Sequence, residues 1–447
     1  MNSEQQYITL FAQTEELICR GSTPVLNAPR KAAIEALERL GLPDRSDERY
    51  RYTDVAKYFE PDYGLNLRRI DMPVDPHDVF RCDVPNMSTS LYFMTNDVVR
   101  RDALGYRPRL PEGVYVGSLL EAARQKPELI SRYYARIADY TQDGTTAINT
   151  AFAQDGFLIY VPKGVVVERP IQLVNILHSD RSMMVNRRML IVVEEGAQVK
   201  LLACDHSMDN INFLATQVIE AYVAPDATLD LYELEESDTL TIRISNLYVR
   251  QEARSTVRLN GVTLFNGSTR NTTRVHMAGA DAHLELGGMA ITDKDQHVDN
   301  HTLVDVDATG CTCHELFKYV LDDRSTAVFS GLMRVQPGAQ QTETAQTARG
   351  ICMTREAHMY SRPQLEIYAD DVKCSHGSTV GQLNDEALFY MRQRGIPERE
   401  AKLLLMFAFI NEAVDHIRLE ALRDRLHHLV EKRFRGELYK CRGCNVC

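Results

Sequence analysis

Two side chains that could act together on a metal or a substrate lie two residues apart late in the chain. Cys374 and His376 belong to the run Asp370-Asp-Val-Lys-Cys-Ser-His376, and alternate residues of an extended strand share one face. A thiolate and an imidazole suit soft and borderline metals, and they could also pair as a nucleophile and its base. Because cysteine is among the residues most often buried, the spacing alone favours a structural pair.

The end of the chain holds a second set of potential ligands. Cys441, Cys444 and Cys447 have the spacing of the first three cysteines of a ferredoxin cluster run, without the fourth cysteine and its proline. Three thiolates could hold a metal or a cluster with one labile iron, or borrow a fourth ligand from elsewhere. The alternative is a frayed tail whose thiols merely oxidise.

Two further pairs carry weaker signals. Cys311 and Cys313 would share a strand face, but two ligands leave the usual four-coordinate site half built. His297 and His301 have the spacing of a helical zinc pair, yet they stand in strand-like sequence with no glutamate beside the first histidine. We therefore expect these histidines at the surface or in turns. The sequence contains no phosphate-binding GxxxxGK[ST] loop, so any ATPase activity is expected to belong to a partner.

The elements that would position these residues are mostly short strands. Alternating apolar residues begin near Gly156 and indicate half-buried strands. A small residue followed by alternating apolar positions recurs at steps of 30, 28 and 27 residues, at Ala197, Ala227, Ser255 and Ala282. A further member is expected two steps on, at Ala339. A near-constant step of short strands favours a β-solenoid over a β-sandwich.

Helices are expected on both sides of the strands. Pro29 can open a helix that Gly41 closes, and a longer helical stretch is expected around residues 114–138. Asn384 or Asp385 can cap a short helix that Gly395 closes, and Pro397 then opens a long helical region. The sequence thus predicts a mostly helical domain over 1–150, a solenoid over 151–383, a helical domain over 384–435 and a cysteine-containing tail over 436–447.

Composition excludes several classes of protein. The formal net charge is -11 and no basic block occurs, so nucleic acid is not an expected partner. No apolar run approaches the ~18 residues of a membrane span, and the N-terminus lacks the basic and apolar regions of a secretory signal. We therefore expect a cytoplasmic protein whose ten cysteines are mainly thiols.

The segment from Pro363 to Gly381, which contains Cys374 and His376, closely resembles the signature of the SufB/SufD family. The resemblance continues through 381–396, upstream through 329–340 and Ala345-Gln346, and at the N-terminus through 41–43, Glu48 and 51–55. The run Lys373-Cys-Ser-His-Gly377 is similar to the SufD branch rather than to the Glu-His-Glu-Ala pattern of SufB.

This resemblance implies a mainly β protein, a right-handed parallel β-helix with N- and C-terminal helical domains. It also implies a scaffold without catalytic activity that pairs with a SufB homologue through the β-helix. His376 is then expected at that interface, near transient iron or a nascent iron–sulfur cluster, and Cys374 beside it. The chain alone is expected to bind no cofactor tightly, although reduced flavin could bind the assembled complex. Without SufB, a homodimer through the solenoid edge is conceivable.

The resemblance further implies that the C-terminal helices dock the ATPase SufC. The apolar run from Leu403 to Ile410 is too apolar for a lone exposed helix, and we expect one face to pack within the chain, on Leu388, Phe389 and Tyr390, and another to meet the partner. The expected docking residues are Leu388, Phe389, Tyr390, Arg394, Leu404 and Phe407.

Two functions of other classes compete with the scaffold. A β-helix carbohydrate-active enzyme, such as a polysaccharide lyase, would need clustered acids and bases on one solenoid face, and is usually secreted. An electron-transfer protein would use the cysteines of the tail, and a colourless, redox-silent chain would argue against it.

Overall fold

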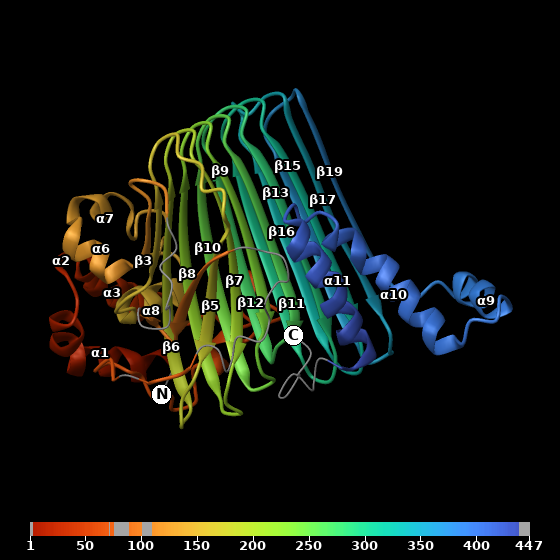
Figure 1. Ribbon diagram of the computed structural model, residues 1–447, viewed down its shortest axis with the longest axis horizontal. Helices are drawn as coiled ribbons and strands as arrows, with labels where there is room; N and C mark the ends of the chain where they lie inside the picture. The colour runs from red at the N-terminus through yellow and green to blue at the C-terminus, as the bar shows by residue number, and fades with distance from the viewer. Residues whose placement is uncertain (1–2, 71, 76–88, 101–109, 438–447) are drawn as a thin grey trace.

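The computed structural model describes residues 3–70, 72–75, 89–100 and 110–437. The middle of the chain winds into a parallel β-solenoid of about eight turns, with helical regions before and after it (Figure 1). From Phe157 onward, successive strands alternate between two sheets, and neighbours within each sheet run parallel. The predicted solenoid is therefore confirmed. The sandwich alternative is wrong, because sandwich sheets are built from antiparallel neighbours.

The first sheet has ten strands in the order β19-β17-β15-β13-β11-β9-β7-β5-β1-β2. Only the pairing of β1 with β2 is antiparallel within it. Its strands have these bounds: β1 Ser90–Thr95, β2 Val98–Arg100, β5 Ile171–Leu177, β7 Gln198–Ser207, β9 Thr228–Glu236, β11 Thr256–Phe265, β13 His283–Thr292, β15 Thr312–Leu321, β17 Thr342–Cys352 and β19 Val372–Gly381.

The second sheet has nine strands in the order β18-β16-β14-β12-β10-β8-β6-β4-β3. Here β3 pairs antiparallel with β4. Its strands have these bounds: β3 Tyr115–Ser118, β4 Phe157–Val161, β6 Met183–Val193, β8 Phe213–Val223, β10 Thr241–Gln251, β12 Ser268–Met277, β14 His297–Val306, β16 Thr326–Val335 and β18 His358–Ile367. Alternate residues of both sheets face inward and form one continuous apolar core.

The repeat seen in the sequence marks the turns that enter the first sheet. In most of these turns a residue in the left-handed region comes directly before a small buried residue, as Asp226 does before Ala227 and Gly310 before Cys311. The expected member Ala339 is buried in such a turn, but the register of β17 places Thr342 beside Cys311. That assignment was therefore wrong by three residues, and two of the three arise because the turn after β16 is two residues longer than the turn after β14.

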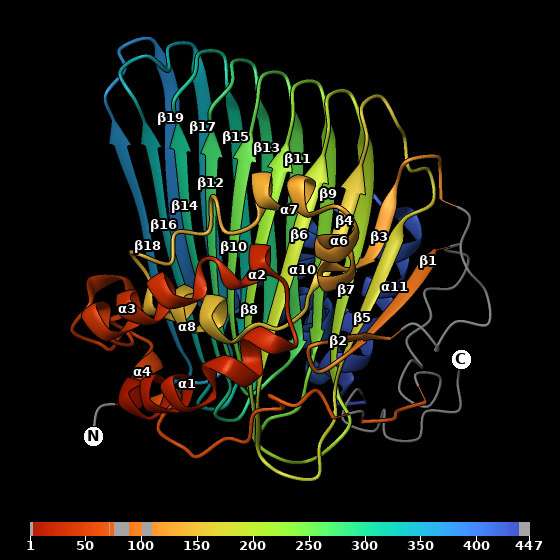
Figure 2. The same cartoon turned by 90° about the vertical axis from the view of Figure 1, so that its left-hand side faces the viewer.

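Eight helical segments are described before β4: α1 Ser3–Arg20, α2 Pro24–Asn27, α3 Arg30–Leu40, the 3-10 helix η1 Glu48–Tyr50, α4 Val55–Tyr58, α6 Leu119–Gln125, α7 Pro127–Tyr133 and α8 Gly144–Phe152. They cover the outer face of the second sheet (Figure 2), where α3 and α8 pack over β6, β8 and β10. The predicted α3 is confirmed, and Gly41 ends it with φ +69°. The stretch 114–138 is a strand followed by two helices, because Pro127 starts a new helix.

In the described residues after the solenoid there are three helices: α9 Asp385–Gln393, α10 Glu398–Val414 and α11 Glu420–Arg435. Asn384 caps α9 by accepting a hydrogen bond from the N–H of Ala387, and Gly395 has φ +83°, as predicted. The apolar faces of α10 and α11 pack on the outer face of the first sheet. In contrast, α9 extends away from the body (Figure 1) and has no buried residue. The two groups of helices therefore lie on opposite faces of the solenoid.

Candidate functional site

The strand β19 carries Cys374 and His376 at the end of the solenoid. Val372 and Cys374 pack against the apolar core, so by alternation His376 and Ser378 lie on the same inward side. Ser378 donates a hydrogen bond to Ser361 of β18 at 2.7 Å, which ties the two last strands together across the interior. Cys374 is half-buried and His376 is exposed. The structure thus brings both candidate ligands to the open end of the core.

His376 is the last member of a column of inward-facing residues that stack from coil to coil. The column runs from Ile171 through four leucines and ends in three polar residues. After Ile171 its members are Leu201, Leu231, Leu259, Leu286, Glu315, Gln346 and His376. Glu315 and Gln346 were not among the candidate site residues predicted from the sequence. A signal was present, because the repeat position changes from leucine to groups that need hydrogen-bond partners.

Glu315 begins the polar part of this column and is 3% exposed. Its Oε2 accepts hydrogen bonds from Gln346 Nε2 at 2.6 Å and from Thr302 Oγ1 at 3.3 Å. Desolvation by burial raises the pKa of Glu315 to about 7, against the lowering effect of these two hydrogen bonds. A carboxyl group that titrates near neutrality therefore lies two coils behind His376.

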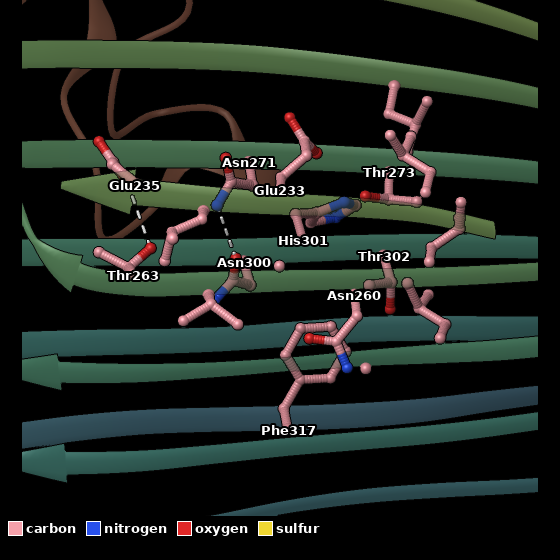
Figure 3. A pocket seen from close by; sticks show the side chains of 18 of the residues that line it. Glu233, Glu235, Asn260, Thr263, Asn271, Thr273, Asn300, His301, Thr302 and Phe317 are labelled. Atoms are coloured by element: carbon pink, nitrogen blue, oxygen red, sulfur yellow. Dashed lines mark hydrogen bonds between the residues drawn. The ribbon is translucent and has the colours of Figure 1, made fainter. Parts of the chain in front are cut away.

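A network of polar side chains crosses the interior of the solenoid closer to its middle. Arg243 contacts Asp205 at 2.9 Å and Glu233 at 2.7 Å, and donates a hydrogen bond to Asn271 at 2.6 Å. Asn271 in turn donates to Asn300 at 2.9 Å (Figure 3). The buried arginine therefore neutralises two of the interior acids, and the amides extend the network to β14.

A cavity of about 40 Å³ lies beside this network. Gly261 lines it, and a Cβ built on this glycine would meet nothing within 4 Å. Asn271, Asn300 and Thr302 supply polar groups to its wall (Figure 3). Such a space holds about three waters and is too small for a sugar ring, so it is no substrate site for a carbohydrate-active enzyme.

Cys311 and Cys313 do not form a metal site, because both are fully buried in the apolar core. Burial raises the pKa of each thiol, which keeps it protonated and therefore a poor ligand. Among the described residues, no group of three or more His, Cys, Asp and Glu side chains is arranged to hold a metal ion. Cys374 and His376 alone could supply at most part of a coordination sphere.

The expectation that His297 and His301 lie at the surface or in turns was wrong. Both lie within β14, on its outward side, which the N-terminal region covers. His297 Nε2 lies 2.8 Å from Thr53 Oγ1, and burial lowers the pKa of His301 to about 3. His297 therefore helps to hold the N-terminal region on the second sheet.

The expected docking residues fall into two groups. In α9, Phe389 and Tyr390 are 62% and 59% exposed, Arg394 stacks over the Tyr390 ring at 5.1 Å, and Leu388 is half-buried. In α10, Leu404 is exposed, whereas Phe407 packs inward and meets Phe434 of α11 with ring centroids 5.5 Å apart.

We expected the buried face of α10 to pack on Leu388, Phe389 and Tyr390, but it does not. Leu403, Met406 and Ile410 pack instead against α11 and the first sheet. This part of the prediction was wrong, because the solenoid offers α10 a larger apolar surface than the short helix α9 does. The aromatic residues of α9 therefore stay available for contact with a partner.

The three cysteines of the tail, Cys441, Cys444 and Cys447, lie outside the described residues. Within the described part of the chain, no helix is both long enough and apolar enough to cross a membrane. The expected ligands that the structure does place are therefore Cys374 and His376.

Comparison with known proteins identifies the family. Residues 1–173 match the SufBD protein N-terminal region, and residues 175–409 match the SufBD core domain of SUF system FeS cluster assembly. The iron–sulfur cluster assembly protein SufD of Escherichia coli is 26% identical over 90% of this chain and 92% of its own length.

Two further relatives span nearly the full length. SufD of Bacillus subtilis is 22% identical over 97% of this chain and 98% of its own length. An iron–sulfur cluster assembly SufBD family protein of Synechocystis is 26% identical over 95% of both chains. Because the core match alone spans more than half of its residues, this chain belongs to the SufBD family of iron–sulfur cluster assembly proteins.

Proposed function

We propose that this chain is a non-catalytic scaffold subunit of the SUF assembly complex. It pairs with a SufB homologue through the solenoid and docks the ATPase SufC through its C-terminal helices. The proposal rests on the open last coil, where β19 leaves Cys374 and His376 at an exposed end of the core. Relatives named SufD along nearly the whole chain support it.

Iron or a nascent cluster is the cargo at this end. Neutral imidazole is a good iron ligand, and the Cys374 thiolate would be a second donor on the same face. Two donors leave a four-coordinate iron half ligated. The SufB homologue therefore has to supply the other ligands, and the chain alone holds iron only weakly.

The aromatic side chains of α9 form the proposed ATPase dock. A helix with no buried residue and two exposed aromatic rings cannot be explained by packing within the chain. Aromatic residues flanked by arginine are typical anchors of protein interfaces. Arg394 stacked on Tyr390 fits that composition.

A mechanical link from this dock to the cargo site follows the contacts of α10. Lys318 of β15 binds the carbonyl oxygen of Phe409 at 2.9 Å and the Glu412 carboxylate. Glu315 lies on the same strand and faces the interior. ATP-driven closure of SufC would therefore pull on β15 and reshape the open end. If so, freezing the ATPase with a non-hydrolysable nucleotide should change the solvent accessibility of His376.

Co-expression with SufB and SufC homologues tests the scaffold. We expect the tagged chain to recover both partners, and a Phe389→Ser, Tyr390→Ser variant to lose SufC while it keeps SufB. Leu17→Ser, Leu40→Ser is the matched control, because it removes two exposed apolar residues from the N-terminal helices. Recovery of neither partner by the unaltered chain would refute the scaffold function.

Iron uptake by the purified complex tests the cargo site. We expect His376→Ala to lower the amount of bound iron about tenfold or more. Loss of a metal ligand, or of the residue that orients it, typically lowers metal affinity by at least that factor. His358→Ala removes another exposed histidine, from β18, and should leave the iron content unchanged. Equal iron in both variants would mean that His376 is not a ligand.

A further inference from the structure

Gln346 stands between the buried Glu315 and the exposed His376. It pairs in register with Glu315 of β15 on one side and with His376 of β19 on the other. Its side chain is fully buried. The three residues face the interior, because Val372 and Cys374 set the inward side of β19. Among the described strands, Gln346 is therefore the only inward-facing register neighbour of His376 within the sheet.

The orientation of the Gln346 amide is determined by its neighbour. Nε2 donates to Glu315 Oε2 at 2.6 Å, so the amide nitrogen faces β15. In the described structure, Gln346 Oε1 is buried and accepts no hydrogen bond. An amide oxygen that has lost water and has no donor is poorly satisfied. It needs an N–H or O–H donor from outside the present set of contacts.

Gly331 on the opposite sheet makes room for this amide. A Cβ at position 331 would lie 2.2 Å from Gln346 Nε2 and 2.8 Å from its Cδ. Any other residue would push the amide away from Glu315. The interior is therefore shaped to hold Gln346 in its place in the column.

We propose that Gln346 positions His376 by accepting a hydrogen bond from one ring nitrogen, which leaves the other nitrogen directed outward toward iron. Ligating histidines commonly use an acceptor of this kind to set their tautomer. The exposed imidazole of His376 can rotate toward Oε1, because the end of the solenoid leaves it unconfined. The inference rests on the proposed function only in naming iron as the ligand of the outward nitrogen.

The test measures the tautomer of His376 in the full-length chain labelled with ¹⁵N-histidine. Ring signals are assigned by their loss in His376→Gln and recorded at about pH 8, above the ordinary imidazole pKa. We expect one dominant tautomer in the unaltered chain, and about a fivefold change of the tautomer ratio in Gln346→Met, the ratio that one net hydrogen bond sustains. Gly331→Ala, which keeps Gln346 but displaces its amide, should shift the ratio in the same direction.

Thr344→Val is the matched control. Thr344 is also buried on β17 without a partner for its hydroxyl, but it pairs in register with Cys374. The control should leave the tautomer ratio unchanged. The same ratio in the unaltered chain, Gln346→Met and Gly331→Ala would overturn the inference.

The outcome separates this inference from the proposed function. A tautomer shift in Gln346→Met, with iron uptake by the complex that does not depend on His376, would support the positioning role and refute the iron role. Iron uptake that depends on His376, with no tautomer shift in either variant, would support the function and refute the role of Gln346.

Discussion

At the scale of single residues, Glu315 is the least expected side chain of the solenoid. It occupies a position where earlier coils have leucine, and its Oε1 is buried without a partner in the described structure. A buried carboxyl group that is only partly hydrogen-bonded favours its neutral form. Burial accordingly raises its pKa to about 7. Its protonation therefore couples the stability of the last coils to pH.

The sign of this coupling is testable with Glu315→Gln. The unfolded pKa is about 4.3, so the stability that the proton confers is complete below that value and is lost as pH rises through about 7. We expect the variant to match the unaltered chain at about pH 4 and to exceed it by about 3 kcal/mol in free energy of unfolding at about pH 8. Urea unfolding at both pH values measures this.

The exposed Glu343 of β17 provides the control for that prediction. Glu343→Gln should change the free energy of unfolding by less than about 0.5 kcal/mol at either pH. A Glu315→Gln variant with the same dependence on pH as the unaltered chain would contradict the assignment of a raised pKa.

At the scale of elements, the buried cations Lys318 and Arg433 fasten the C-terminal helices to the first sheet. Lys318, 2% exposed in its side chain, joins β15 to α10. Arg433 joins α11 to the same sheet through the carbonyl oxygen of Leu264 and the carboxylate of Asp293. The segment α9 has no comparable buried contact. Helices α10 and α11 are therefore fixed to the solenoid, while α9, the proposed ATPase dock, is held only through α10.

We expect Lys318→Met to loosen α10 without unfolding the solenoid. The change leaves the Phe409 carbonyl without its donor, at a cost of about 1–3 kcal/mol, so local opening of α10 should become more frequent. Hydrogen exchange measured by mass spectrometry should show faster exchange in residues 398–414 only. Lys200→Met, at an exposed lysine of β7, is the control. Unchanged exchange in α10 would show that the anchor is dispensable.

At the scale of the whole molecule, the two ends of the solenoid differ. N-terminal helices and the strands β1 to β3 cover the first coils (Figure 2), whereas the last coil ends in exposed strands. Several large exposed apolar residues belong to this end: Ile367, Tyr368 and Val380. Solenoids need a polar cap at each end. An uncovered apolar end therefore favours a partner, either the SufB homologue or a second copy of the chain.

Val380→Glu tests whether this end is the interface. A charge at this 45% exposed position should abolish recovery of the SufB homologue in the pull-down while the variant stays folded, because the side chain faces solvent in the free chain. Val166→Glu is a matched control, since Val166 is 46% exposed near the other end. Equal recovery of SufB by both variants would place the interface elsewhere.

The sequence by itself determined the solenoid and the helices that flank it. A step of 27 to 30 residues with alternating apolar positions specified stacked coils, and Gly41, Asn384 and Gly395 marked helix ends that the structure confirms. These signals are local, since each depends on backbone conformation or on period two within one strand. The motif around Cys374 and His376 was visible for the same reason.

The surroundings of that motif, in contrast, depend on long-range packing. The alignment of Glu315, Gln346 and His376 depends on the exact number of residues in each turn, and the misplaced Ala339 shows how a lengthened turn moves the register. The environment of His301 depends on which distant segment covers the outer face of β14, and the position of α10 depends on which surface its apolar face packs against. Local pattern sets which face of a strand is apolar, but the partner of that face is chosen by long-range packing, which no short window of sequence contains.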